Sequence, residues 1–176
     1  KAEGELDGRP VVYSVWDLTR LQSFAESGRT REDMVIDLAD AGGVLPALPA
    51  HLKGADYEAY LVVVPGPQLA AIYDQWGARL LEQNVRVFLQ AKNSVNKGIR
   101  ATLENEPDMF FAYNNGITAT AEEVTTAKTG TGLAITRLKN LQIVNGGQTT
   151  ASIYAASSNA EIDLAATYVQ MKLSII

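Results

Sequence analysis

Hydrophobic positions along this chain follow two periods, the alternation of a β-strand and the three-to-four-residue spacing of an amphipathic helix. Alternating or continuous apolar runs predict strands over residues 11–13, 34–38, 57–64, 109–113, 117–121, 124–127, 132–138, 141–144 and 167–176. Helical spacing predicts helices over residues 15–27, 68–76, 94–105 and 148–156. Strands mixed with single helices indicate an α+β (mixed α/β) fold, in which several helices pack on a mixed β-sheet.

Glycine and proline mark the breaks between these elements. Residues 39–56 contain Gly42, Gly43, Pro46, Pro49 and Gly54, and we expect a loop there. The strand at 57–64 ends in a continuous apolar run, residues 61–64, which predicts burial on both faces in the middle of a sheet. Residues 80–89 fit either a strand or a helix.

Two glycine turns stand out in the second half of the chain. Asn114-Asn115-Gly116 separates two β-prone runs and predicts a hairpin, since both positions of a type I′ turn have positive φ. Asn145-Gly146-Gly147 follows the strand at 141–144 and directly precedes a helix. The free N–H groups of such a helix start suit an anion, although Asn145 or Thr149 can cap them equally well.

Composition restricts the classes of function. The 176 residues are 47% hydrophobic, which is enough for one core, and the net charge of −5 argues against a broad basic face for nucleic acid. There is no cysteine and one histidine, His51, which excludes disulfides and multi-histidine metal sites within this chain. No apolar run approaches the roughly 20 residues of a membrane span, and no signal peptide opens the chain. We therefore expect a soluble, cytoplasmic protein without a membrane partner.

The two ends of the sequence suggest a longer protein. The chain begins with Lys1, and residues 167–176 form an alternating, strand-like pattern without a terminating signal. A terminus inside an apolar strand would leave its edge and its apolar face without cover. We therefore expect residues 1–176 to form a single domain within a longer chain that has further segments on both sides.

Two clusters of uncharged polar residues are candidate ligand contacts, because side-chain amides can donate and accept hydrogen bonds at once. The first comprises Asn114, Asn115 and Thr118, and the second comprises Asn145, Gln148, Thr149 and Thr150. Turn geometry and helix capping explain both clusters without a ligand. With a ligand, the two clusters would form opposite walls of one polar cleft.

A local basic segment precedes these clusters. It contains Arg86, Lys92, Lys97 and Arg100, with Asn84, Asn93 and Asn96 among them. One interpretation is a solvated helix face. The other is a set of phosphate contacts to nucleic acid or a nucleotide, which the acidic chain as a whole does not forbid.

The evidence for catalysis is weaker. Two fragments imitate the PD-(D/E)xK pattern of metal-dependent nucleases: Asp163 with Gln170-Met171-Lys172, and Asp74 with Gln90-Ala91-Lys92. Both consist of common residues at loose spacing, which alternating strands produce by themselves. No catalytic residue is assigned, and neither a cofactor nor a metal is expected, except Mg²⁺ if the nuclease alternative holds.

Three stretches of the sequence resemble the abortive infection phage resistance (AIPR) family. They are FFAYNNGIT at residues 110–118, LQIVNGGQTTASI at residues 141–153 and NVRVFLQAKNSVNKGIRATL at residues 84–103. VWDLTRL at residues 15–21 resembles a less specific element, so the resemblance covers roughly residues 9–176. Its hallmark positions here are Asn84, Arg86, Asn96, Asn114, Asn115, Gly116, Thr118, Asn145, Gly146, Gln148 and Thr149. The resemblance assigns them no chemical role.

The resemblance implies part of a larger bacterial anti-phage defence protein, in which a restriction-endonuclease-like segment commonly precedes this region. The leading hypothesis is a non-catalytic recognition or sensing domain that binds nucleic acid or a nucleotide. The expected binding residues are Asn84, Arg86, Asn96, Arg100, Asn114, Asn115, Thr118, Asn145, Gly146, Gln148 and Thr149. The alternatives are part of a metal-dependent nuclease, or a structural or oligomerisation module. Expected partners besides the ligand are other segments of the same full-length protein and a second copy of the chain.

Overall fold

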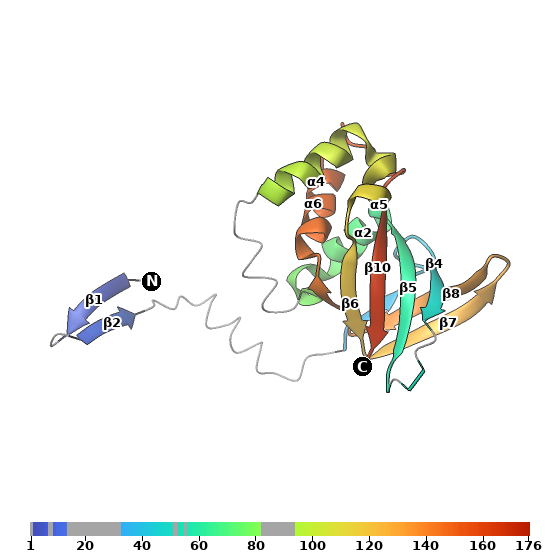
Figure 1. The fold of residues 1–176 in the computed structure, drawn as a ribbon, viewed down its shortest axis with the longest axis horizontal. Coiled ribbons are helices and arrows are strands. Elements are labelled where there is room, and N and C mark those ends of the chain that lie inside the picture. The colour runs from blue at the N-terminus through green and yellow to red at the C-terminus, as the bar shows by residue number, and fades with distance from the viewer. Residues whose placement is uncertain (1, 7–8, 14–32, 51–52, 55, 82–93) are drawn as a thin grey trace. The chain divides into compact units, whose positions relative to one another are not determined.

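The computed structural model describes residues 2–6, 9–13, 33–50, 53–54, 56–81 and 94–176 (Figure 1). The chain divides into two compact units, Lys1–Asp33 and Met34–Ile176. In the first unit, strands β1 (Ala2–Leu6) and β2 (Arg9–Tyr13) form an antiparallel pair, which confirms the strand expected at 11–13. The helix expected at 15–27 and most of residues 80–89 lie outside the described residues. The expectation of a single domain stays a prediction.

The second unit contains the remaining elements. Its strands are β3 (Val35–Asp37), β4 (Leu45–Ala50), β5 (Glu58–Pro65), β6 (Ile117–Ala121), β7 (Glu123–Thr129), β8 (Gly132–Lys139), β9 (Gln142–Asn145) and β10 (Tyr168–Ile175). Its α-helices are α2 (Gly66–Trp76), α4 (Ser94–Asn105), α5 (Phe110–Tyr113) and α6 (Gly147–Ser157), with short 3-10 turns η1 (Gly77–Leu80) and η2 (Pro107–Met109). This set confirms the α+β class.

The strands of the second unit form one mixed sheet of eight strands within the described residues. Its order is β3-β8-β4-β5-β10-β6-β9, and β7 pairs with the other edge of β8. Neighbouring strands run antiparallel except β10 and β6, which are parallel. The parallel pair brings the last strand of the chain beside the strand that follows the Asn114-Asn115-Gly116 turn.

Helices α2, α4 and α6 lie on one side of this sheet (Figure 1). The core forms between them, where Val62, Val64 and Met171 from the strands and Leu69 and Ile153 from the helices are each at most 3% exposed. Burial of such side chains stabilises the fold by about 1.5–3 kcal/mol each. The helices therefore pack against one of the two faces of the sheet.

The other face of the sheet is open. Leu48 on β4 and Leu61 and Val63 on β5 are 65%, 51% and 37% exposed. The prediction that residues 61–64 are buried on both faces is therefore wrong, because only Val62 and Val64 point toward the helices. A central strand can carry a continuous apolar run when one of its faces is covered and the other is exposed.

Two local predictions fail. Residues 110–113 form one helical turn, α5, in place of the first strand of the expected hairpin. Phe110 is 1% exposed, and its carbonyl accepts the Asn114 N–H at 2.9 Å, so burial of this aromatic overrides the β-propensity of the run. The expected loop at 39–56 contains strand β4. Its prolines are tolerated because β4 pairs with β8 only at its start and with β5 only afterwards.

Candidate functional site

The two amide clusters expected from the sequence lie side by side. Strand β6 pairs with β9 so that Thr118 is opposite Asn145, with a register shift directly after Thr118. Farther along, Thr149 Oγ1 donates a hydrogen bond to Asn114 Oδ1 at 3.4 Å. We call residues 114–118 together with residues 145–149 the motif joint. The sequence therefore predicted correctly that the two clusters meet, although the first follows a helical turn and not a strand.

Asn114 holds the first half of the joint in place. It is half-buried, and its Oδ1 accepts the Gly116 N–H at 2.8 Å as well as the Thr149 hydroxyl. The side-chain bond to the second following N–H is an Asx-turn, which fixes the chain direction before β6 begins. Asn114 Oδ1 therefore already accepts two hydrogen bonds within the protein and is not available to a ligand.

Close backbone packing explains the two glycines of the joint. Gly116 has φ +75°, and a Cβ there would lie 2.3 Å from the Gln170 carbonyl oxygen on β10. Gly146 has φ +85°, and a Cβ there would lie 2.7 Å from the Gly116 carbonyl oxygen and 2.9 Å from Ile117 Cα. Both positions require glycine for conformation and for space.

At the start of α6, hydrogen-bond donors have no partners within the described part of the chain. Gly146 precedes the helix and offers no side-chain cap, while Asn145 Oδ1 accepts the Gly146 N–H at 2.8 Å. Asn145 is exposed, so its Nδ2 group is accessible. Gln148 Nε2 is buried and has no hydrogen-bond partner among the described residues. A buried amide donor without a partner costs free energy that a ligand acceptor would recover.

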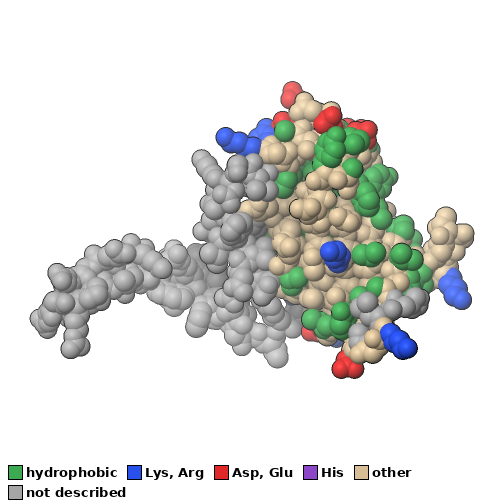
Figure 2. All heavy atoms as spheres, in the orientation of Figure 1, with side chains coloured by type: hydrophobic (Ala, Val, Ile, Leu, Met, Phe, Trp, Pro, Cys, Tyr) green, Lys and Arg blue, Asp and Glu red, His purple; other side chains and the backbone are tan. Residues whose placement is uncertain are grey.

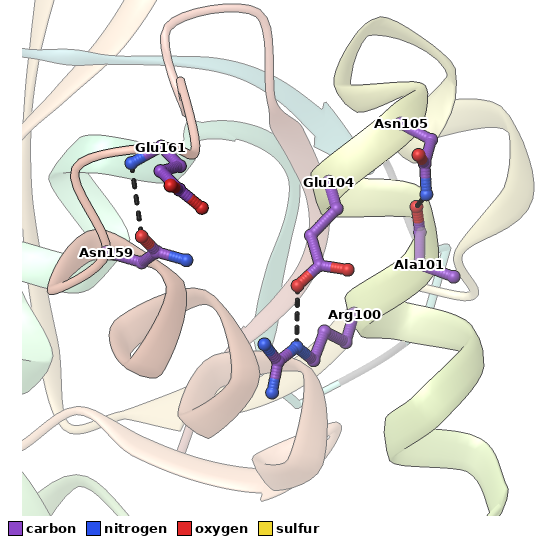
Figure 3. Close-up of polar contacts among 6 residues, drawn as sticks. All are labelled: Arg100, Ala101, Glu104, Asn105, Asn159 and Glu161. Atoms are coloured by element: carbon purple, nitrogen blue, oxygen red, sulfur yellow. Dashed lines mark hydrogen bonds and ion pairs between the residues drawn. The ribbon is translucent and has the colours of Figure 1, made fainter.

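The other predicted site residues do not join this group within the described structure. Asn115 belongs to the motif joint by position, but its side chain is exposed and forms no hydrogen bond with the described residues. Arg100 forms an ion pair with Glu104 one turn further along α4, with Nε 2.7 Å from Oε1 (Figure 3). Asn96 lies in α4, and its side chain is outside what the structure describes, as are Asn84 and Arg86.

Sequence reasoning did not connect Lys172 with this site. Lys172 on β10 is directly opposite Thr118 on β6, and Thr118 is opposite Asn145. Neighbouring strands are about 4.8 Å apart, so the Lys172 and Asn145 backbones are separated by roughly 10 Å. Only the parallel pairing of β10 with β6 creates this proximity, and no local sequence pattern indicates that pairing.

The described carboxylates of the two nuclease fragments form local hydrogen bonds. Asp163 Oδ1 accepts the Ala165 N–H at 2.8 Å, and Asp74 Oδ1 accepts the Tyr154 hydroxyl at 2.9 Å. In the part of the chain that the structure describes, no three His, Cys, Asp or Glu side chains are grouped to hold a metal ion. Residues 90–92 of the second fragment lie outside the described residues.

A second polar group lies between α2 and α6. Tyr154 packs against Tyr73 with ring centroids 5.0 Å apart, and its bond to Asp74 raises the pKa of the Tyr154 hydroxyl above the ordinary 10.0. Asp74 and Tyr154 line a hollow of about 450 Å³ that continues to Leu164. This pair ties α2 to α6 and does not contact the motif joint in any recorded hydrogen bond of the described residues.

The comparison with family models identifies the class of protein. The model described as AIPR protein matches residues 81–176, which include the motif joint, α4, α6 and strands β6 to β10. The chain therefore belongs to the AIPR family. This membership supports a role in abortive infection, that is, in anti-phage defence. Searches among curated proteins and among solved structures gave no match.

Among the described residues, no helix is both long enough and apolar enough to cross a membrane. The cytoplasmic location expected from the sequence stays a prediction.

Proposed function

We propose that this chain is a non-catalytic recognition domain that binds nucleic acid or a nucleotide at the motif joint. The observation that carries the proposal is the pair of amide donors beside the α6 start, Asn145 Nδ2 and Gln148 Nε2. The side-chain oxygens of Asn114 and Asn145 accept hydrogen bonds within the joint, so these two side chains offer mainly N–H donors to a ligand. Phosphate and base oxygens are acceptors that such donors recognise.

The electrostatics of the α6 start support an acceptor ligand. A helix N-terminus carries about half a positive charge, and Gly146 supplies no side chain that would neutralise its free N–H groups. Gln148 Nε2, which has no partner in the described structure, belongs to the second residue of this helix. An anionic or carbonyl oxygen bound there would satisfy the helix start and the buried amide together.

The structural alternative is favoured by a different set of contacts. Asn114, Gly116, Gly146 and Thr149 are all explained by packing and by hydrogen bonds inside the joint. These residues fix the β6, β9 and α6 geometry whether or not a ligand binds. The structural role and ligand binding therefore depend on different residues. Asn114 maintains the fold, whereas Asn145 contacts the ligand.

This separation gives the experiment. Binding of labelled single-stranded DNA, single-stranded RNA, duplex DNA and ATP by the purified chain is measured at low salt, for the wild type and for Asn145→Ala. The proposal predicts binding of at least one of these probes and a loss of about tenfold in Asn145→Ala at unchanged melting temperature. Asn159→Ala is not a suitable control because Asn159 Oδ1 accepts the Glu161 N–H (Figure 3). Thr126→Ala, which alters an exposed side chain on β7 outside the motif joint, serves instead. Absence of binding by the wild type, or equal binding by Asn145→Ala, rejects the proposal in favour of the structural role.

A further inference from the structure

The motif joint continues into the open face of the sheet. By the strand register, Leu48, Leu61, Lys172, Thr118 and Asn145 form one row across β4, β5, β10, β6 and β9. Each member of this row is exposed or half-buried. The helices cover the opposite face, so nothing in the described part of the second unit covers this row. A ligand at Asn145 would therefore meet Thr118 and Lys172 next.

The charge of this face differs from that of the chain. Among the outward-facing positions of β4, β5, β10 and β6, all of them described, Lys172 carries the one charge, whereas the whole chain has a net charge of −5. Within the described residues, the Lys172 side chain forms no hydrogen bond and no ion pair. Figure 2 shows a basic side chain on this face surrounded by uncharged and hydrophobic ones. The face is therefore complementary to a ligand with few negative charges and much apolar surface.

Aromatic side chains lie at the start of β10. Tyr168, on the same face as Lys172, is 44% exposed and precedes it by four residues, or about 13 Å along the strand. Helix α5 contacts β10 and carries Phe111 and Tyr113, which are 44% and 60% exposed. Exposed aromatic rings on a sheet are stacking platforms for unpaired bases.

From these observations we infer that the ligand of the motif joint is a single-stranded nucleic acid that crosses the open face of the sheet. Lys172 contacts a phosphate, Tyr168 stacks on a base, and Asn145 donates to an acceptor of the same strand. This inference rests on the proposed function and narrows its ligand. Two uncharged neighbours of Lys172 would then lie beside the nucleic acid: Thr118 of the motif joint, opposite Lys172, and Gln170, which lies next to Gly116.

Two physical arguments favour a single strand over a duplex. A duplex is held mainly by many phosphate contacts, and one lysine on an acidic chain supplies few. Bases inside a duplex are not available to aromatic side chains, whereas those of a single strand are. Leu48 and Leu61 alone would equally suit a protein partner, but the combination of an unpaired lysine, an aromatic ring and amide donors favours the nucleic acid.

The test compares salt dependence among variants of the full 176-residue chain. Fluorescence anisotropy with labelled oligothymidylate, oligouridylate and a duplex of equal length is recorded over a salt series for the wild type, Lys172→Ala, Tyr168→Ala and Lys128→Ala. Lys128 is an exposed lysine on β7, at the far side of β8, and is the matched control. Circular dichroism melting confirms that each variant is folded.

The inference predicts that single strands bind more tightly than the duplex. Lys172→Ala should weaken binding and reduce the slope of log K against log salt by about 0.7, the value for one phosphate contact of a single strand. Tyr168→Ala should weaken binding about tenfold with the slope unchanged, as expected for one stacked base. Lys128→Ala should bind like the wild type.

The outcomes that contradict the inference are distinct from those that contradict the proposed function. Binding that Asn145→Ala weakens but Lys172→Ala and Tyr168→Ala leave unchanged overturns the inference alone, as does preference for the duplex. Absence of binding to every nucleic acid and to ATP overturns both. Concentration-dependent self-association that Leu61→Ser abolishes, in a chain that binds no strand, would assign the open face to a second copy of the protein.

Discussion

Thr149 Oγ1 donates a hydrogen bond to Asn114 Oδ1 across 35 positions of the sequence, at 3.4 Å. The same oxygen accepts the Gly116 N–H at 2.8 Å, so one side chain joins the α5 turn, the start of β6 and the first turn of α6. Two of the stretches that carry the resemblance to the AIPR family therefore form a single structural unit.

Asn114→Ala tests this relationship. The substitution leaves the Gly116 N–H and the buried Thr149 hydroxyl without their acceptor, and we expect a loss of about 1–3 kcal/mol in unfolding free energy. Urea denaturation followed by circular dichroism measures the loss. Asn115→Ala, at the adjacent exposed position, should stay within about 0.5 kcal/mol of the wild type. Equal stability of the two variants would show that the hydrogen bond does not hold the joint.

Gly146→Ala should be more damaging. The new Cβ would lie 2.7 Å from the Gly116 carbonyl oxygen, and alanine disfavours φ +85°, so we expect a loss of at least about 2 kcal/mol. Gly130→Ala is the control, because its φ is ordinary and nothing lies within 4 Å of its added Cβ. Thermal melting of both variants decides the prediction; a Gly146→Ala chain as stable as Gly130→Ala would contradict the close approach of the two turns.

The Tyr154–Asp74 bond predicts a dependence on alkaline pH. Because this hydrogen bond raises the pKa of Tyr154, its contribution to stability is complete below about pH 10 and is lost as pH rises through the higher folded-state pKa. The difference in tyrosinate absorbance between the wild type and Tyr154→Phe gives the titration of this residue. When the same comparison, with and without Tyr154→Phe, is made in the Asp74→Asn protein, the titration of Tyr154 should shift to lower pH. An unshifted titration would show that Asp74 does not perturb Tyr154.

The recognition function predicts that binding needs no divalent metal. The described residues hold no acidic or histidine cluster for a metal ion, and the candidate nuclease acids Asp163 and Asp74 are used in local hydrogen bonds. Nucleic-acid affinity should therefore be the same in EDTA and in Mg²⁺, apart from ionic strength, and the nucleic acid should remain intact on gels. Mg²⁺- or Mn²⁺-dependent cleavage that disappears in Lys172→Ala would support the nuclease alternative.

Local sequence patterns predicted most of the second unit because its strands and helices carry regular periodicity and clear stop signals. Examples are α2, which ends at Gly77 with φ +50°, and the β7–β8 hairpin around Gly130. The patterns failed where tertiary burial decides the backbone. Phe110 enters the core and forms a helical turn, and Pro46 and Pro49 stand in a strand whose pairing partner changes along its length.

The candidate site was predictable in part for the same reason. Turn chemistry singled out Asn114 and Asn145, and the structure brings their turns together. The position of Lys172 was not predictable, because it depends on a parallel pairing between residues 54 positions apart in sequence, such as Thr118 and Lys172. Residues Asn84 and Arg86, which the family resemblance singled out, lie outside the described residues, so their part in the site stays a prediction.

The most direct test of the recognition function follows the side-chain amides themselves. In ¹⁵N-labelled protein titrated with a single-stranded oligonucleotide, the NH₂ signals of Asn145 and Gln148 should shift and saturate together. The signal of Asn105 is the control and should not change comparably, because Asn105 Nδ2 already donates a hydrogen bond to Ala101 O on α4 (Figure 3). Assignment by Asn145→Ala identifies the first signal. Signals of Asn145 and Gln148 that stay unchanged at saturating oligonucleotide and at saturating ATP would contradict ligand recognition at the motif joint.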